Sequence, residues 1–455
     1  MIQFRVWLAL TIARLGVWVI KSANLGSGTT WPGHIALRID PLFVLHVLEK
    51  SSCRVILVAG TNGKTTTASM IRTIIEKNTN ERVIYNAEGA NLISGVASVL
   101  IARQDDITSR PAWCVFECDE NALRAVVTQT KPEVVVLLNL FRDQLDRYGE
   151  VNSIGAEWKD LFAAHKDVNY IVNADDPLLA SLVNDCPRVD AYSAPQSMMK
   201  QRTLGHDVDS IYCPICRAAL TYTHIAYSHI GNYHCSSCGF ARPKHEDYGE
   251  FKGKKYPLMG LYNLYNTHAA ILASTKVLGI APRAAFEVLT THFVPMFGRQ
   301  EVLRYKDRQL TIMLSKNPAG FNQAVQALTE AANQHKTAVL ILLNDQIPDG
   351  RDVSWIWDVE LDDLMSLAEV CYGGERAYDI ALRAAYTFEK VPEVLHENGE
   401  ITCAGSHITT DIEVAIDQFV KRYSPSHTLY ILATYSAMLA ARRHIAGNSF
   451  HTQQS

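Results

Sequence analysis

The sequence predicts an α/β protein of two or three domains, and three features support this fold class. From Arg54 onward, short runs of β-branched residues alternate with helical patterns, which is the layout of a parallel sheet covered by helices. A loop rich in glycine and threonine directly follows the first of these runs. A second series of strands and helices begins near Leu310, and a chain of 455 residues is too long for one ordinary core.

The expected strands fall into two groups. Those of the first group are the runs 54–59, 113–117, 134–138 and 168–172, and those of the second are 310–314, 338–343 and 428–434, with a helix over 321–335. Between the groups, residues 205–252 break the alternation with cysteine pairs, which indicates an inserted module. We therefore expect an N-terminal helical segment (1–50), a central domain (51–297) that carries the insert, and a C-terminal α/β domain (298–455).

Composition favours a globular protein of a reducing compartment. Hydrophobic residues make up 48% of the chain and charged residues 20%, and the net charge of -4 predicts no general affinity for nucleic acid or anionic membranes. Four of the ten cysteines cluster and six are scattered, unlike the disulfide framework of a small secreted protein. We expect a cytoplasmic protein.

The N-terminal stretch from Phe4 to Ile20 is apolar, but Arg5 and Arg14 interrupt it. No uncharged run approaches the roughly 20 residues that a membrane-spanning helix needs. A small-residue cleavage site after an apolar segment is also missing, which argues against a secretory signal. We expect a helix packed on the next domain, and the alternative is a helix that lies on the inner membrane surface.

The run from Gly60 to Thr67 has the composition and the position of a phosphate-binding loop. It stands between a strand that ends at Ala59 and a helical pattern, so backbone N–H groups at the helix start can bind phosphate oxygens. Lys64 can reach the β- and γ-phosphates, and the Thr65 hydroxyl can hold Mg²⁺. The loop is shorter than a general phosphate loop, because Val58 stands where the first glycine is usual. The predicted ATP-binding residues of this loop are Gly60, Thr61, Asn62, Gly63, Lys64, Thr65 and Thr66.

The inserted module contains two Cys-x-x-Cys pairs, separated by 18 residues rich in β-formers. The four cysteines are Cys213, Cys216, Cys235 and Cys238. Four thiolates at this spacing predict a tetrahedral Zn²⁺ site on a ribbon of hairpins, and a closed site of this kind is structural. A nucleic-acid-binding ribbon is less favoured, because Arg217 is the only strong base between the pairs.

The short loop Gly-Thr-Asn-Gly-Lys-Thr-Thr-Thr resembles the ATP loop of the Mur ligases and folylpolyglutamate synthases. Further motifs follow in the family's order, namely Glu117, Asn139 with the run 142–149, the run 173–176, Gly260 to Asn266, and Gly298-Arg299-Gln300. The resemblance implies a Mur-ligase fold, a Mg²⁺ ligand at Glu117, and nucleotide contacts from Asn266 and Arg299. In the run 142–149, Gln144 and Tyr148 replace two histidines of the family.

Many Mur ligases carry a carbamylated lysine that binds a second Mg²⁺. Lys159 is the nearest candidate here, but it is about one residue out of register, and we expect a surface helix residue.

The C-terminal part differs from ordinary Mur ligases at residues 315–320 and 344–355. Together with the zinc ribbon, these segments resemble the MurT family, the ligase subunits of lipid II isoglutaminyl synthase. The resemblance implies ATP-dependent amidation of the α-carboxylate of D-isoglutamate in the lipid II stem peptide, through an acyl phosphate. It also implies a heterodimer with a GatD-like class I glutaminase that supplies ammonia, and lipid II as the substrate at the inner membrane surface.

The same resemblance assigns catalytic roles to Lys64 and Glu117 in the ligase site and to Asp352 in the partner's site. Asp352 would orient the histidine of the glutaminase, with Asp349 and Asp358 as the alternatives. Cys371 is not expected to be a nucleophile, since Glu369 stands where a nucleophile elbow has glycine.

Two other functions compete with this interpretation. One is a self-sufficient ligase that joins an amino acid to a carboxylate, as folylpolyglutamate synthase does. The other is a degenerate ATPase whose zinc ribbon docks a partner. The intact phosphate loop argues against the second, and the unusual C-terminal segments argue against the first.

Overall fold

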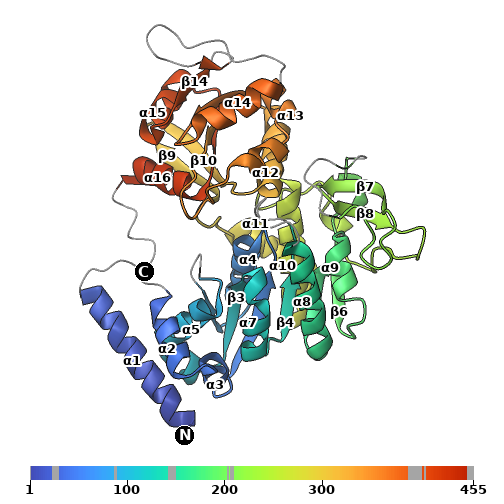
Figure 1. Ribbon diagram of the computed structural model, residues 1–455, viewed down its shortest axis with the longest axis vertical. Coiled ribbons are helices and arrows are strands. Elements are labelled where there is room, and N and C mark those ends of the chain that lie inside the picture. The colour runs from blue at the N-terminus through green and yellow to red at the C-terminus, as the bar shows by residue number, and fades with distance from the viewer. Residues whose placement is uncertain are drawn as a thin grey trace.

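The computed structural model describes residues 2–22, 30–86, 90–141, 150–201, 204, 210–387, 402–403 and 406–447. Two α/β domains stand end to end, and the N-terminal helix α1 (Ile2–Ser22) lies at the outer edge of the first (Figure 1). The run 142–149, which the sequence analysis matched to a family motif, lies outside the described residues.

The central domain contains a six-stranded parallel sheet in the order β2-β3-β1-β4-β5-β6. Its strands are β1 (Cys53–Ala59), β2 (Arg82–Tyr85), β3 (Ala112–Cys118), β4 (Val134–Leu137), β5 (Asn169–Asn173) and β6 (Val189–Tyr192). All four strands predicted for this domain are confirmed, as β1, β3, β4 and β5. The short edge strands β2 and β6 carry weaker β-branched patterns, and sequence reasoning missed them.

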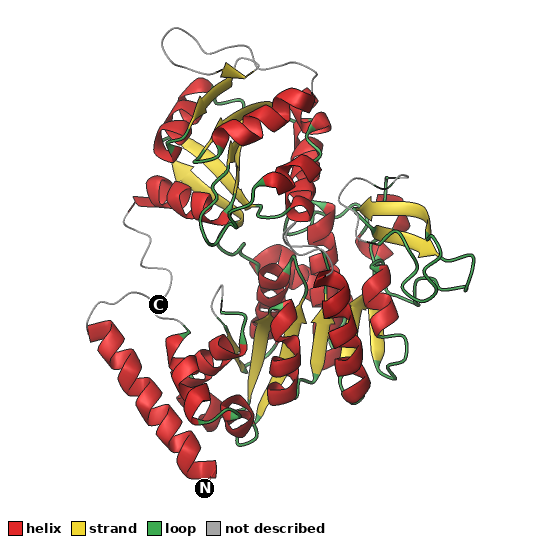
Figure 2. Cartoon of the chain, viewed as in Figure 1, coloured by secondary structure: helices red, strands yellow, loops and turns green. Residues whose placement is uncertain are grey.

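Helices cover both faces of this sheet (Figure 2). Both faces are covered because successive residues of β1 are apolar and point to opposite sides. Val55 and Leu57 pack with the helices of one face, whereas Ile56 and Val58 pack with those of the other. The first face carries α2 (Trp31–Ile39), α3 (Phe43–Leu48), α5 (Ile93–Ala102), α7 (Leu123–Thr130), α8 (Glu150–Ala164) and α9 (Pro177–Leu182). The second carries α4 (Lys64–Asn78), α10 (Leu261–Leu278) and α11 (Pro282–His292).

The C-terminal domain contains a seven-stranded mixed sheet in the order β13-β14-β12-β11-β15-β10-β9. Its strands are β9 (Arg299–Tyr305), β10 (Arg308–Leu314), β11 (Thr337–Leu342), β12 (Glu369–Gly373), β13 (Thr402–Cys403), β14 (Ser406–Thr409) and β15 (Thr428–Ala433). The three predicted strands are confirmed as β10, β11 and β15, and the predicted helix is α12 (Pro318–Ala332). The other covering elements are η5 (Ser354–Asp358), α13 (Asp362–Leu367), α14 (Ala377–Thr387), α15 (Ile412–Arg422) and α16 (Tyr435–Ala446).

The insert contains the hairpin of β7 (Thr221–Tyr227) and β8 (Ile230–His234), at the side of the central domain (Figure 1). The prediction of an N-terminal helix packed on the next domain is confirmed, because Val6, Ala9 and Ala13 are buried in the same core as α2. None of the helices that the structure describes has both the length and the apolar character to cross a membrane.

His268 is a fully buried polar residue that ties α10 to the rest of the central domain. Its Nδ1 lies 2.8 Å from the carbonyl oxygen of Ser193, and its Nε2 lies 2.9 Å from the hydroxyl of Tyr256. Since a carbonyl only accepts, Nδ1 carries the hydrogen and Nε2 accepts from Tyr256. Burial lowers the pKa of His268 to about 4, so the imidazole is neutral in the folded protein.

We expect the free energy of unfolding to fall as the pH decreases from about 6.5 to about 4, because over this range the unfolded chain protonates His268 and the folded chain does not. The contribution of this residue between pH 7 and pH 5 is about 2 kcal/mol. Urea denaturation at both values should show a smaller pH dependence in His268→Gln than in the wild type. The exposed His335→Gln is the control, and an unchanged pH dependence in His268→Gln would refute the assignment.

Candidate functional site

The phosphate loop lies at the carboxyl end of β1 and leads directly into α4. Gly60 and Gly63 have φ angles of 143° and 90°, which side-chain-bearing residues rarely adopt. A Cβ atom at Gly63 would also collide with the side chain of Asn266, so glycine permits the close approach of α10 to the loop. The loop therefore needs both glycines, one for its turn and one for its contact with α10.

A segment after β4 clasps the phosphate loop. Asn139 accepts from Thr61 N through its backbone oxygen (3.0 Å) and from Asn62 N through Oδ1 (2.9 Å), and its Nδ2 donates to Asn62 O (3.0 Å). Phe141 N donates to the Thr61 hydroxyl oxygen at 3.0 Å. These bonds fix the loop from the side of β4, and they give Asn139 a definite structural role.

Lys64 folds back over the loop. Its Nζ donates to the backbone oxygens of Gly60 and Thr61 and to Glu120 Oε2, the last at 3.2 Å. The sequence analysis did not single out Glu120. Its position, three residues after Glu117 and just beyond the end of the strand, was a signal that could have identified it. The ammonium group of Lys64 is therefore positioned at the loop, where a bound phosphate would compete with these oxygens for it.

Thr65 and Glu117 meet at the start of α4. The Thr65 hydroxyl donates to Glu117 Oε2 at 2.8 Å, and both side chains are buried. Asn86 holds β3 at this point, since its Oδ1 accepts from Glu117 N and its Nδ2 donates to Glu117 O. Hydroxyl and carboxylate oxygens are the ligands that Mg²⁺ prefers, and the pair fits a Mg²⁺ that also binds phosphates.

The C-terminal domain forms the opposite wall of the site. A cleft between the domains is lined by Asn62, Gly63, Thr66, Asn266, Arg299 and Gln323, among others. Asn317, at the start of α12, reaches across it, with its Nδ2 3.3 Å from Asn62 Oδ1. The structure thus brings the predicted ATP-binding residues together, from the phosphate loop to Asn266 and Arg299. Sequence reasoning missed Asn317 and Gln323, because their place at the cleft depends on how the domains pack.

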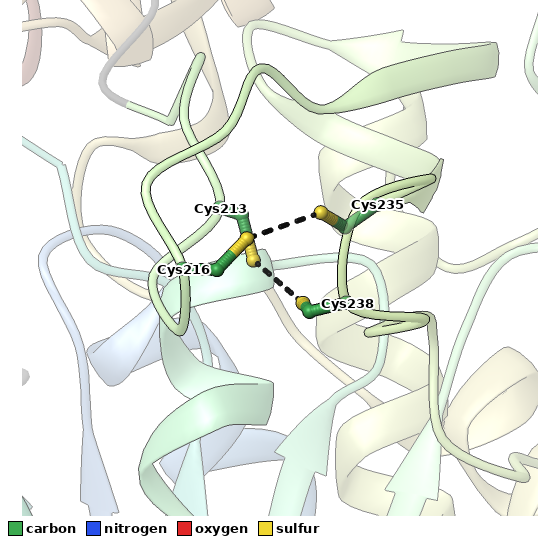
Figure 3. Close-up of side chains that lie close together, drawn as sticks. All are labelled: Cys213, Cys216, Cys235 and Cys238. Carbon is green, nitrogen blue, oxygen red and sulfur yellow. Dashed lines mark hydrogen bonds between the residues drawn. The ribbon is translucent and has the colours of Figure 1, made fainter.

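The four predicted zinc ligands converge (Figure 3), with all their sulfur atoms within 4.8 Å of one another. The distances are 3.6 Å between Cys213 and Cys238 and 3.5 Å between Cys216 and Cys235. Sulfur atoms at about 2.3 Å from a tetrahedral zinc lie about 3.8 Å apart, so the cluster is compatible with zinc. A backbone N–H bond from Cys238 lowers the pKa of Cys235 to about 7, which favours its thiolate.

Both cysteine pairs form the same turn. Arg217 N donates to Cys213 O and Gly239 N to Cys235 O, each at 2.9 Å, and both donors have positive φ angles, 62° and 76°. The two loops therefore present their thiols in equivalent ways, as a closed structural site requires.

The insert is anchored in the central domain through Asp175, which is fully buried. Its carboxylate accepts from Arg242 Nη1 (2.5 Å), from the Tyr265 hydroxyl (2.7 Å) and from the Ser193 hydroxyl (2.6 Å). Its backbone oxygen accepts from Gly231 N, in the hairpin, at 2.9 Å. The motif residue Asp175 thus fixes the position of the ribbon.

The tip of the hairpin reaches the back of the phosphate-loop clasp. His229 is completely buried, with its ring centroid 4.9 Å from that of Phe141 and its Nε2 3.7 Å from Asp176 Oδ2. Asp176 in turn accepts from Leu140 N at 3.1 Å. The zinc ribbon is therefore in contact with the segment that holds Thr61, and His229 has a packing role that the sequence did not reveal.

Asp352 lies on the surface of the C-terminal domain, where its Oδ1 accepts from Ser354 N at 2.8 Å. The alternative Asp349 is buried, and its carboxylate is bonded to the backbone N–H and the hydroxyl of Ser436. Of these two residues, Asp352 is the one that a partner can reach.

Two residues set aside in the sequence behave as expected. Lys159 is exposed on α8. Cys371 is buried in β12, 3.3 Å from the Tyr423 hydroxyl, and burial raises the pKa of its thiol.

Comparisons with known proteins agree with this architecture. Residues 58–274 match the Mur ligase middle domain, and residues 314–438 match the MurT ligase C-terminal domain. The lipid II isoglutaminyl synthase (glutamine-hydrolyzing) subunit MurT of Streptococcus pneumoniae is 31% identical over 448 residues, which cover 93% of this chain and 94% of the relative. The subunit of the same name from Staphylococcus aureus is 31% identical over 414 residues, covering 87% and 91%.

Solved structures share the fold. A pseudomurein peptide ligase type C from Methanothermus fervidus aligns with a TM-score of 0.62 at 22% identity, over 88% of this chain and 80% of that one. The folylpolyglutamate synthase of Mycobacterium tuberculosis aligns with a TM-score of 0.55 at 14% identity, over 89% and 95%. At these identities the likeness concerns the fold alone.

We expect Cys213→Ser and Cys235→Ser to lose zinc and to lower the melting temperature by about 5 °C or more, because metal-binding energy in such sites is folding energy. The measurements are metal analysis and thermal unfolding of the purified chain. Cys186→Ser, which removes a partly buried thiol outside the cluster, is the control. Far less than about one zinc per wild-type chain would contradict a zinc site of this kind.

Proposed function

This chain belongs to the MurT family of Mur ligases, and we propose that it amidates the α-carboxylate of D-isoglutamate in the lipid II stem peptide. It is an ATP-dependent ligase. The observation that carries the proposal is the complete phosphate loop, with Lys64 across it and the Thr65–Glu117 pair at its end. The names of the relatives, which cover nearly the whole chain, support this choice of substrate.

The reaction has two steps. A carboxylate oxygen of the substrate attacks the γ-phosphorus of ATP, and ADP leaves, which gives an acyl phosphate. Ammonia then attacks the acyl carbon and loses a proton, and inorganic phosphate leaves from the tetrahedral intermediate. The products are the amide, ADP and phosphate, and the released phosphate contains one oxygen of the former carboxylate.

Negative charge is the main obstacle to the first step, because a carboxylate must approach a triphosphate. The side chain of Lys64 and the N–H groups at the start of α4 supply fixed positive potential at the phosphates. Mg²⁺, held by Thr65 and Glu117, would supply further charge neutralisation. Arg299 lines the same cleft from the C-terminal domain and can add a cation next to the nucleotide.

The ammonia is proposed to come from a GatD-like class I glutaminase subunit. The relatives are named as subunits of a glutamine-hydrolyzing enzyme, which implies a complex. Asp352 is accessible on the C-terminal domain, and the exposed Trp357 and Tyr386 stack edge to face nearby, on η5 and α14. Exposed aromatic side chains beside an accessible carboxylate are typical of a protein-binding surface.

In the proposed complex, Asp352 accepts a hydrogen bond from the catalytic histidine of the glutaminase and so fixes its tautomer. Its bond to Ser354 N holds the carboxylate on a short helix whose Trp355 and Ile356 are buried, so the position is well fixed. Because the substrate carries a lipid, we further propose that the enzyme works at the inner face of the cytoplasmic membrane.

We expect Lys64→Ala to reduce amidation by about 10²-fold or more without unfolding the protein, since the side chain contributes charge to the phosphate site and little packing. Steady-state kinetics with ATP and lipid II measure this effect. Lys77→Ala, at the opposite end of α4, removes the same charge away from the site. Normal turnover in a folded Lys64→Ala would refute the ATP-loop assignment.

We expect Asp352→Asn to reduce glutamine-driven amidation by about 10²-fold or more, because an amide favours the wrong tautomer of the partner's histidine and cannot support its charged form. The variant should still bind ATP and still use free ammonia at high concentration and pH. Assays with glutamine and with ammonia are therefore run in parallel on the copurified complex.

Asp358→Asn, at the end of the short helix η5 that follows Asp352, is the matched control and should change neither assay. If ammonia-driven activity of Asp352→Asn disappears as well, this residue belongs to the ligase site. If neither activity changes, the carboxylate of Asp352 serves only its bond to Ser354 N, and the proposal that this chain completes the partner's site is wrong.

A further inference from the structure

The N-terminal helix α1 exposes a row of large apolar side chains. Phe4, Trp7, Ile12 and Leu15 have exposed fractions of 62%, 59%, 40% and 61%. They recur at intervals that place them on one side of a helix, and the rings of Phe4 and Trp7 stack with centroids 6.1 Å apart. We call these four side chains the outer face of α1.

The opposite side of α1 is buried. Val6, Ala9, Leu10 and Ala13 belong to the core that also contains α2 and α5. In α2, Gly33 approaches α5 so closely that its N–H donates to Ser98 Oγ at 2.8 Å, and a Cβ atom would collide with the backbone of Ser94. The helix α1 is therefore held by its inner face, and within the part of the chain that the structure describes its outer face stays exposed.

The charge of this region differs from that of the whole protein. The chain has a net charge of -4, yet residues 1–39 contain Arg5, Arg14, Lys21 and Arg38 and no acidic residue. Arg5 and Arg14 are exposed on either side of the outer face, and Arg14 pairs at 3.7 Å with Asp105, which is almost fully exposed. An exposed apolar row with cationic flanks matches the interface of an anionic bilayer, where apolar groups enter and arginine meets phosphate.

The position of α1 also suits a lipid-linked substrate. The helix α1 packs against α5. The residues just before α5 are bonded to the end of β3, because Asp119 N donates to Asn91 O. Asn86 Nδ2 also bridges the two segments, since it donates to both Ala90 O and Glu117 O. Through α2 and α5, the helix α1 is thus linked to the part of the domain where β3 ends and Glu117 lies. In Figure 1, α1 runs along the outer edge of the central domain.

We propose that the outer face of α1 lies in the interface of an anionic lipid bilayer and holds the ligase at the surface that carries its substrate. This inference rests on the proposed function, because lipid II is confined to a membrane. The helix lies along the surface and does not cross it, because Arg5 and Arg14 interrupt its apolar stretch. Membrane binding of this kind needs no overall positive charge, since the basic residues are local.

The first test is flotation of the purified chain with vesicles of phosphatidylglycerol and phosphatidylcholine, at low and at high salt. The wild type should bind the mixed vesicles, and binding should weaken in salt or with phosphatidylcholine alone. The double variant Trp7→Ser, Leu15→Ser should bind at least about tenfold more weakly, because it removes two large apolar groups from the interface. Val302→Ser, an exposed apolar residue on β9, is the control.

The second test compares amidation of lipid II in vesicles with amidation of a soluble, lipid-free stem-peptide substrate, using free ammonia. The double variant should lose activity about tenfold on vesicles and keep its activity on the soluble substrate. Equal loss on both substrates, or a lowered melting temperature, would assign the outer face to the stability of the fold and overturn the inference.

The remaining outcomes are also decisive. The wild type could fail to bind either kind of vesicle, while size measurements show that a second copy or the glutaminase covers the outer face. In that case the membrane is not the partner of this face. If vesicles are bound but neither substrate is amidated, the proposed function fails and the membrane surface stands by itself.

Discussion

The clasp between the phosphate loop and the segment from Asn139 to Phe141 is the interaction on which the site depends. A loop that binds a triphosphate must already have its binding conformation when the ligand arrives, because reordering the loop during the reaction would reduce the stabilisation that it provides. The clasp fixes this conformation with uncharged backbone and amide groups, and the N–H groups of Thr61 and Asn62 are used for it. Behind it, Asp176 and His229 connect the loop to the zinc ribbon. The ribbon that carries the four cysteines is thus packed behind the phosphate loop, on the side of Asn139 and Phe141.

The carboxyl ends of four neighbouring strands assemble this site. β1 leads into the phosphate loop, β3 ends at Glu117, β4 is followed by Asn139, and β5 leads to Asp176. The C-terminal domain adds Arg299 and Asn317 from the other side of the cleft. In the proposals made above, different surfaces serve different partners: the cleft for ATP, the surface around Asp352 for the glutaminase, and the outer face of α1 for the bilayer. Such a separation would let one chain link a soluble ammonia source to a lipid-linked acceptor.

Local features of this protein were predictable from its sequence, and long-range ones were not. The buried strands, the phosphate loop and the four cysteines are short patterns whose physical cause lies within a few residues, and the strands and the cysteine cluster were found where expected. The predicted ATP-binding residues lie together in the structure, although their roles await the experiments described above. The contacts of Lys64 with Glu120, of His229 with Phe141, and of Asn317 with Asn62 join residues that are distant in sequence. A local pattern can mark one member of such a pair, as it could have marked Glu120, but it does not show which distant residue that member contacts. The outer face of α1 was visible only as apolar composition, since burial alone separates its two sides.

The central claim is that this chain activates a carboxylate with ATP, and an isotope experiment tests it most directly. Lipid II whose D-isoglutamate α-carboxylate carries ¹⁸O is incubated with the chain, its partner, ATP, Mg²⁺ and ammonia, and the released phosphate is analysed by mass. The acyl-phosphate route transfers one labelled oxygen to phosphate for each amide formed. Amide formation with unlabelled phosphate, or ATP hydrolysis without amide formation, would contradict the account.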